Sequence, residues 1–219
     1  MPHQLFIVED HPVVRQGLTS LIEPESDLKI VGESGSAQEA RRALSDTDVD
    51  LVILDLSLSD GTGLTLLEHL HATQPELPVL VVSMHDESLY ARRALDAGAE
   101  GYVMKSKARP HIVEAIGHVL DGNVYLSPEM TSAILSERVG DTQPTGTSPL
   151  DSLSDRELEV FMLLGEGYER REIAEALMLS PKTIDTYKTH LKEKLSLETN
   201  AGLRRYAAVW VESSEAPAE

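Results

Sequence analysis

Short apolar runs alternate with helix-like segments five times along the first part of the chain, and this alternation constrains the fold more than any other feature. The runs are rich in Val, Ile and Leu, as expected of strands buried on both faces. Strand–helix pairs in succession predict a doubly wound α/β domain with a five-stranded parallel sheet. The pairs are expected at 4–8 and 12–22, 28–34 and 36–45, 51–55 and 62–72, 78–83 and 87–97, and 101–104 and 109–121.

Acidic side chains stand where two of these predicted strands end. Glu9 and Asp10 follow the first run, and Asp55 closes the third. Because the carboxyl ends of parallel strands meet at one crevice, these carboxylates are expected to lie together and to repel one another. A hard divalent cation such as Mg²⁺ relieves that repulsion and keeps positions open for water or phosphate. The pattern predicts phosphoryl transfer to an aspartate.

Two other strand ends bring a hydroxyl and an ammonium group to the same crevice. Ser83 ends the fourth predicted strand, and Lys105 follows the fifth. Asp55 is expected to attack phosphorus, while Ser83 and Lys105 stabilise the phosphoryl oxygens. The expected ligands of Mg²⁺ are Glu9, Asp10, Asp55 and the backbone carbonyl of Ser57.

Taken singly, each of these residues has an ordinary interpretation. Asp55 fits a turn, Ser83 a loop hydroxyl and Lys105 a solvated charge, so only their joint position at strand ends predicts chemistry. His11 is either a metal ligand or base, or the residue that enters the first helix. We favour the helix entry, because Pro12 follows directly.

The second part of the chain is predicted to be helical. The composition of residues 140–149 is that of a flexible linker, and a short linker helix is expected at 130–139. Ser154 and Glu157 have capping-box spacing, and Ser180 followed by Pro181 marks another helix start. Residues 172–178 and 181–195 then predict a short helix, a turn and a longer helix, which is the outline of a helix-turn-helix.

The longer helix has an apolar stripe formed by Ile184, Tyr187, Leu191 and Leu195. Side chains off this stripe can place lysines against phosphates and polar groups against base edges, although an ordinary solvated helix has the same pattern. The expected DNA contacts are Arg170, Arg171, Lys182, Thr183, Asp185, Thr186, Lys188, Thr189 and Lys192. A final stripe, at Leu203, Tyr206, Ala207 and Trp210, suits either dimerisation or the domain's own core.

Composition limits the other functions that the chain can have. A net charge of −18 opposes nucleic-acid binding, so any DNA contact must come from the local lysines of residues 180–195. The chain has no cysteine, which excludes disulfides, thiolate catalysis and cysteine-ligated zinc. We expect a cytoplasmic protein, because no apolar run is long enough to span a bilayer and no signal-peptide pattern precedes the first strand.

The first part of the chain resembles the receiver domain of two-component response regulators. The resemblance covers about residues 4–122 and is carried by Ile7–Pro12, Asp55–Gly61, Val82–Ser83 and Gly101–Lys105. It implies a flavodoxin-like fold in which Asp55 accepts a phosphoryl group from a phosphohistidine on a sensor histidine kinase. It also implies that Tyr102 is the switch aromatic, which moves with Ser83 toward the phosphoryl group.

The second part is similar to the LuxR-type DNA-binding domain. Matching residues are Leu153–Glu157, Arg171–Ala174, Leu179–Ile184 and Lys194–Leu195. The two resemblances together imply a NarL/FixJ-type response regulator, a phosphorylation-dependent transcription factor that binds double-stranded DNA and forms a homodimer when phosphorylated or DNA-bound. The expected boundaries are 1–122 for the receiver, 123–150 for a partly helical linker, 151–211 for the DNA-binding domain and 212–219 for a flexible acidic tail.

Two other functions remain open at this point. Phosphatases of the haloacid-dehalogenase type also use a strand-end aspartate with Mg²⁺, but they need a second acid where this chain has Ser57. A phosphorylation-independent DNA-binding protein is the other alternative. The expectation is a regulator that is not an enzyme and has at most self-dephosphorylation activity.

Overall fold

The computed structural model describes residues 1–58, 61–139, 149–177 and 179–215. The chain divides into two compact units, Met1–Val139 and Gly140–Glu219, and each is described by itself. Within the described residues, no helix combines the length and the apolar character needed to cross a membrane.

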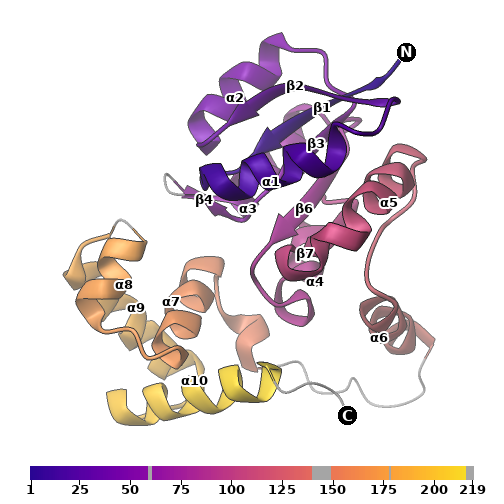
Figure 1. Cartoon of the computed structure of the whole chain (residues 1–219). Coiled ribbons are helices and arrows are strands. Elements are labelled where there is room, and N and C mark those ends of the chain that lie inside the picture. The colour runs from indigo at the N-terminus through magenta and orange to yellow at the C-terminus, as the bar shows by residue number, and fades with distance from the viewer. Residues whose placement is uncertain (59–60, 140–148, 178, 216–219) are drawn as a thin grey trace. The chain divides into compact units, whose positions relative to one another are not determined.

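The first unit is built on a parallel sheet, and the predicted α/β fold is confirmed (Figure 1). Among the described residues this sheet has five strands, in the order β2-β1-β3-β6-β7, which is the flavodoxin-like arrangement. Their neighbouring pairs are all parallel. The strands are β1 His3–Val8, β2 Leu28–Ser34, β3 Leu51–Leu54, β6 Val79–Ser83 and β7 Gly101–Met104.

Helices cover both faces of the sheet, so the strands are buried from two sides. On one face α1 and α5 pack over alternate strand residues such as Leu5, Ile7 and Val82. The next residues along each strand, such as Phe6 and Val81, are also buried and point to the opposite face. The helices of this unit are α1 Pro12–Ile22, α2 Ala37–Asp46, α3 Gly63–Thr73, α4 Glu87–Asp96, α5 Ala108–Leu120 and α6 Pro128–Val139.

Local sequence signals account for several of these boundaries. Ser36 caps α2, because its side chain accepts the N–H of Glu39 at 3.1 Å. Gly98 follows α4 with φ +102°, as predicted for a C-terminal glycine. Two features differ from expectation. A two-stranded antiparallel pair, β4 Ser57–Leu58 and β5 Gly61–Thr62, lies between β3 and α3 where no strand was predicted, and α6 begins at Pro128 instead of residue 130.

The second unit is helical throughout its described residues. It contains the 3₁₀ turn η2 Pro149–Ser152 and the helices α7 Asp155–Gly165, α8 Arg170–Ala176, α9 Pro181–Lys194 and α10 Asn200–Glu215. The capping box of Ser154 with Glu157 and the Ser180 cap before Pro181 are present as predicted. The α8 helix starts two residues before the expected Glu172, which brings Arg170 into its first turn.

A small apolar core joins these helices. Phe161, Ile173, Ile184 and Leu191 are fully buried, and Leu203 lies beside them from α10. Most of the last predicted stripe therefore packs inside its own unit. The described part of α10 continues through the first residues of the tail expected at 212–219, while residues 140–148 of the expected linker and 216–219 of that tail lie outside the described residues.

Candidate functional site

Three carboxylates meet at the carboxyl ends of β1 and β3, as predicted. The backbone N–H of Asp55 donates to the carbonyl of Val8 at 2.9 Å, which places the two strand ends side by side. Glu9 and Asp55 are buried, with 1% and 2% exposure, and Asp10 is partly exposed. Ligand atoms of Glu9, Asp10, His11 and Asp55 all lie within 4.8 Å of one another. This oxygen-rich group has the composition and spacing of a site for a hard cation.

Lys105, which directly follows β7, forms ion pairs with two of these carboxylates. It begins the 3₁₀ turn η1 Lys105–Lys107, and its Nζ lies 2.8 Å from Asp55 Oδ2 and 2.7 Å from Glu9 Oε2. Burial alone would lower the pKa of Lys105, but Asp55 and Glu9 raise it above its ordinary value. Lys105 is therefore charged, and it neutralises part of the acidic cluster.

The carboxyl group of Asp55 is held in an unfavourable environment for its charge. Burial raises its pKa to about 6, Lys105 opposes the rise and Glu9 adds to it. Its Oδ1 is buried and has no hydrogen-bond partner among the described residues. A buried oxygen without a partner costs free energy, and a bound cation or a phosphoryl group would relieve that cost. The residues present therefore fit Mg²⁺.

Ser83 and Tyr102 lie beside this cluster and share a partner. Ser83 is fully buried, and its Oγ accepts the backbone N–H of His85 at 3.2 Å. The Tyr102 hydroxyl donates to the backbone carbonyl of His85 at 2.9 Å, and its ring is 1% exposed. In this structure the predicted switch aromatic is thus already turned inward.

His85 is a site residue that the sequence reasoning missed. Its Nε2 lies 2.9 Å from the Ser57 Oγ, and its ring stacks on Tyr90 with centroids 4.2 Å apart. Burial, followed by the charge of Lys105, lowers its pKa to about 4, so the ring is neutral at pH 7. The one available signal was its position two residues after the strand-end Ser83. The carbonyl of Ser57 as a metal ligand stays a prediction.

His11 occupies the position that was favoured for it, the residue before α1, and its side chain makes no capping hydrogen bond. The structure adds a contact that was not expected. The Nδ1 of His11 lies 2.7 Å from Asp10 Oδ1 and 3.5 Å from Glu9 Oε1. Because the ring is largely exposed, it stands at the mouth of the acidic cluster.

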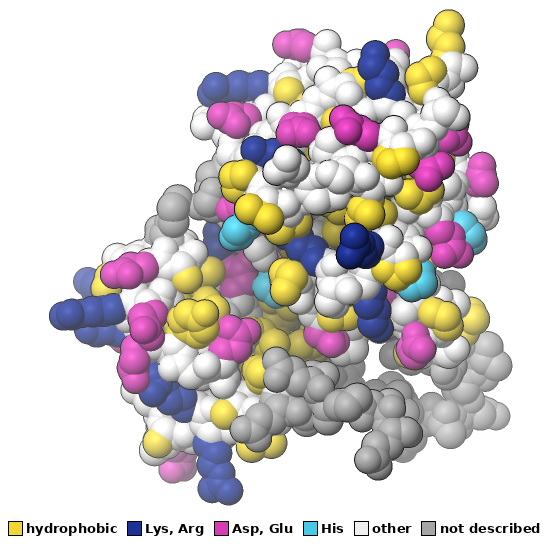
Figure 2. Space-filling view, viewed as in Figure 1, with side chains coloured by type: hydrophobic (Ala, Val, Ile, Leu, Met, Phe, Trp, Pro, Cys, Tyr) yellow, Lys and Arg dark blue, Asp and Glu magenta, His cyan; other side chains and the backbone are white. Residues whose placement is uncertain are grey.

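The predicted DNA-contacting residues lie on α8 and α9 in the second unit. Lys182, Asp185, Thr186 and Thr189 are exposed, as the helical spacing predicted. The two arginines at the start of α8 are exposed as well, and Thr183, Lys188 and Lys192 are partly buried. Figure 2 shows that Lys and Arg side chains project from this unit with Asp and Glu between them. The surface is therefore mixed in charge, despite the lysines of α9.

Contacts within this surface engage several of its polar groups. Arg170 Nη1 lies 2.8 Å from Asp185 Oδ2, so these two expected DNA contacts form an ion pair. Ser180 caps α9, since its Oγ accepts the backbone N–H of Thr183 at 3.1 Å, and the hydroxyls of these two residues lie 2.8 Å apart. The Thr189 hydroxyl donates to the Asp185 carbonyl at 3.0 Å and keeps an acceptor for DNA.

Arg204 on α10 is a basic residue of this surface that was not predicted. It pairs with Glu169 at 2.9 Å and lines the same cavity as Lys188. Burial, and then the charge of Arg204, lowers the pKa of Lys188. The spacing of residues within α9 gave no signal for Arg204, because only the tertiary fold brings α10 next to the surface of α8 and α9.

Comparison with known proteins agrees with both units. The family model for the response regulator receiver domain matches residues 5–117, and that for bacterial regulatory proteins of the luxR family matches residues 151–207. The oxygen regulatory protein NreC of Staphylococcus carnosus (strain TM300) is 33% identical over 208 residues, which cover 93% of this chain and 96% of that protein. NreC of Staphylococcus epidermidis (strain ATCC 12228) is 32% identical over 209 residues, with the same two shares.

Solved structures of similar sequence cover the whole chain as well. RcsB from Salmonella enterica serovar Typhimurium, bound to promoter rprA with the phosphomimetic BeF₃⁻, matches with a TM-score of 0.64 and 28% identity. That match covers 95% of this chain and 99% of RcsB. A structure of two RcsB dimers bound to two parallel DNAs has 26% identity and a TM-score of 0.58, covering 99% of this chain and all of RcsB.

Proposed function

Because this chain belongs to the response regulators that join a receiver domain to a LuxR-type DNA-binding domain, and regulates transcription in response to phosphorylation, we propose that its phosphoacceptor is Asp55. The observation that carries the proposal is the buried Asp55 Oδ1, which has no hydrogen-bond partner among the described residues and lies beside the Lys105 ammonium. An oxygen in this position is free to bond to phosphorus, and the ammonium group offsets the added negative charge.

The transfer is a displacement at phosphorus. An Asp55 oxygen forms the new O–P bond, the P–N bond to a phosphohistidine of the sensor histidine kinase breaks, and the electron pair returns to that histidine. Lys105 and the Ser83 hydroxyl hold the phosphoryl oxygens. Glu9, Asp10, Asp55 and the Ser57 carbonyl would hold Mg²⁺, which when bound would neutralise charge on the transferring group.

Two alternatives from other classes have less support. A haloacid-dehalogenase-type phosphatase would need an acid at position 57, where the hydroxyl of Ser57 instead contacts His85. The family is one of transcription regulators and not of classical enzymes. Self-dephosphorylation, with water attacking the acyl phosphate in the same crevice, is the most catalysis that we propose. Binding of DNA without any dependence on phosphorylation is the second alternative, and it is tested below.

We assign residues 1–122 to the receiver, 123–150 to the linker, 151–211 to DNA binding and 212–219 to a tail. The contacts proposed for DNA are those of α8 and α9: Lys188 and Lys192 with Arg170, Arg171 and Lys182 for phosphates, and Thr186 and Thr189 for base edges. Asp185 lies on the same surface, where its ion pair with Arg170 makes it a neutralising partner of that cation. Thr183 mainly supports the Ser180 cap at the start of α9, to which it donates its backbone N–H. Because RcsB binds DNA as dimers, we propose a homodimer on two half-sites, working in the cytoplasm where the chromosome lies.

Intact-mass measurement tests the phosphoacceptor. The full chain is incubated with a small phosphodonor and Mg²⁺, and it should gain one phosphoryl group that Asp55→Asn does not gain. Glu9→Gln with Asp10→Asn should slow the reaction and weaken Mg²⁺ binding in titration. Labelling of Asp55→Asn at the wild-type rate would remove Asp55 from its role. Equal DNA affinity before and after labelling would favour the phosphorylation-independent alternative.

A further inference from the structure

The segment between α5 and α6 is bound to the edge of the sheet. The N–H of Tyr102 donates to the carbonyl of Tyr125 at 2.9 Å, and the N–H of Tyr125 donates to the carbonyl of Glu100 at 2.9 Å. Gly101 and Tyr125 form a parallel bridge. A Cβ on Gly101 would lie 3.2 Å from the Tyr125 carbonyl oxygen. The linker therefore extends the sheet next to β7 at the residue predicted to be the switch aromatic.

A second contact ties the start of α6 to the start of α4. Glu87 is the first residue of α4 and is only 8% exposed. Its Oε1 accepts the backbone N–H of Ser127 at 2.8 Å. Ser127 in turn accepts the N–H of Met130 on its Oγ at 3.1 Å, so it caps α6. One buried carboxylate thus joins the first turns of two helices that are far apart in sequence.

The same part of α4 is connected to the phosphoryl-accepting crevice. His85 lies two residues before Glu87, donates its N–H to Ser83 and accepts the hydroxyl of Tyr102. A displacement of Ser83 or Tyr102 toward Asp55 must change the position of the His85 backbone. Because packed interiors respond by discrete rearrangement rather than by smooth deformation, such a shift at His85 reaches Glu87.

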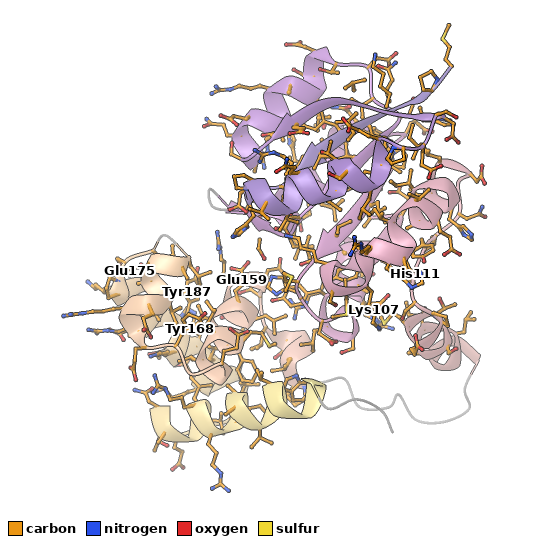
Figure 3. All side chains as sticks on the ribbon, in the orientation of Figure 1. Lys107, His111, Glu159, Tyr168, Glu175 and Tyr187 are labelled. Carbon is orange, nitrogen blue, oxygen red and sulfur yellow. The ribbon has the colours of Figure 1, made fainter. Side chains whose placement is uncertain are left out.

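The surroundings of Glu87 leave the linker room to move. A cavity of about 380 Å³ lies between β7, the start of α5 and the start of α6, and it is lined by Glu87, Tyr102, Lys107, His111 and Tyr125 among others. Figure 3 shows Lys107, from η1, and His111, from α5, reaching into the space beside α6. The Glu87–Ser127 bond and the Tyr125 bridge connect the start of α6 to α4 and to the sheet.

We propose that Glu87 is a positioning residue that holds the linker helix α6 to α4 and so makes the position of α6 depend on the state of Asp55. The proposal rests on the proposed function and names the element that carries its signal. The α6 helix ends at Val139, the last residue of the first unit, so the contact controls the part of this unit that leads in sequence to the DNA-binding domain.

The test uses three variants of the full chain. Glu87→Ala removes the acceptor, Glu87→Gln keeps an acceptor oxygen, and Ser127→Ala keeps the backbone N–H that donates. For each, DNA affinity is measured with and without phosphorylation, and the rate of Asp55 labelling is measured separately. In Glu87→Ala the ratio of the two affinities should fall at least about fivefold toward one, while labelling stays within about twofold. Glu87→Gln should keep the wild-type ratio, and Ser127→Ala, which loses the cap of α6 but keeps the donating N–H, should stay closer to the wild type than Glu87→Ala does.

Hydrogen exchange at the Ser127 amide gives an independent readout. The amide should exchange faster in Glu87→Ala than in the wild type, and as slowly as the wild type in Glu87→Gln. An unchanged affinity ratio in Glu87→Ala, or equal Ser127 exchange in that variant and the wild type, would overturn the proposal. A wild-type chain with no phosphorylation-dependent affinity would contradict the proposed function instead, and the exchange data would then decide whether the contact holds α6.

Discussion

At the scale of single residues, the buried carboxylate of Asp55 destabilises the folded protein when it is ionised. Burial raises the pKa of Asp55 from 3.8 to about 6, so the folded state binds this proton more tightly than the unfolded state does. The stability that protonation contributes to the folded state is therefore lost as pH rises through about 6. Without divalent cations, Asp55→Asn should therefore be more stable than the wild type at pH 7.5, by roughly 1–3 kcal/mol. Chemical denaturation at several pH values should show this gain shrinking toward pH 4. A gain that instead grows in acid would contradict the assignment.

His85 should matter for stability more than the hydrogen bond it makes to Ser57. His85→Ala removes a buried ring stacked on Tyr90 and should lower the free energy of unfolding by roughly 2–4 kcal/mol, whereas Ser57→Ala should cost only about 0.5–1.5 kcal/mol. The single tryptophan, Trp210, lies in the other unit, so calorimetry of the full chain is the suitable measurement. Equal losses in the two variants would show that the ring packing contributes nothing beyond the hydrogen bond.

At the scale of elements, the start of α3 is fitted against the backbone of Asp55. A Cβ on Gly63 would overlap the carbonyl oxygen of Asp55 and come within 2.6 Å of the Leu56 Cα. Gly63→Ala should therefore lower the midpoint of thermal unfolding and slow the labelling of Asp55. The control is Gly17→Ala on α1, where an added Cβ would meet no described atom within 4 Å apart from the neighbouring backbone of its own helix, and where alanine should stabilise by about 0.5–1 kcal/mol. A harmless Gly63→Ala would mean that α3 can shift without disturbing the site.

The strands and helices of both units could be predicted because apolar periodicity and capping residues are local signals. The Ser154 and Ser180 caps and the five parallel strands are examples. The short β4–β5 pair was missed because two residues on each side carry no period. The roles of His85 and Arg204 were missed for another reason. Their partners lie on other elements, and only the tertiary fold brings them together.

At the scale of the whole molecule, a chain with a net charge of −18 must bind a polyanion through a small surface. The strand ends of the first unit gather carboxylates around Lys105, whereas α9 of the second unit carries lysines. Because the acidic cluster and the lysines belong to different units, the acidic residues can bind a cation at the phosphoryl-accepting site while the lysines contact DNA. This separation also predicts strong salt dependence, because local lysines act against an unfavourable overall field.

The ion pair between Asp185 and Arg170 allows two roles for Asp185 in DNA binding, and the two roles predict different effects of replacing it. If Asp185 mainly neutralises Arg170, then Asp185→Asn should free the Arg170 cation, tighten binding to all DNA sequences and steepen the salt dependence of binding by about one ion. Lys188→Ala should have the reverse effect. If Asp185 instead accepts a hydrogen bond from a base, Asp185→Asn should cost roughly 1–3 kcal/mol at the preferred sequence alone. Affinities for selected and random DNA at several salt concentrations decide between them. We expect the first result, because the 2.8 Å contact already directs Asp185 Oδ2 at the Arg170 guanidinium, and specificity should then come mainly from Thr186 and Thr189.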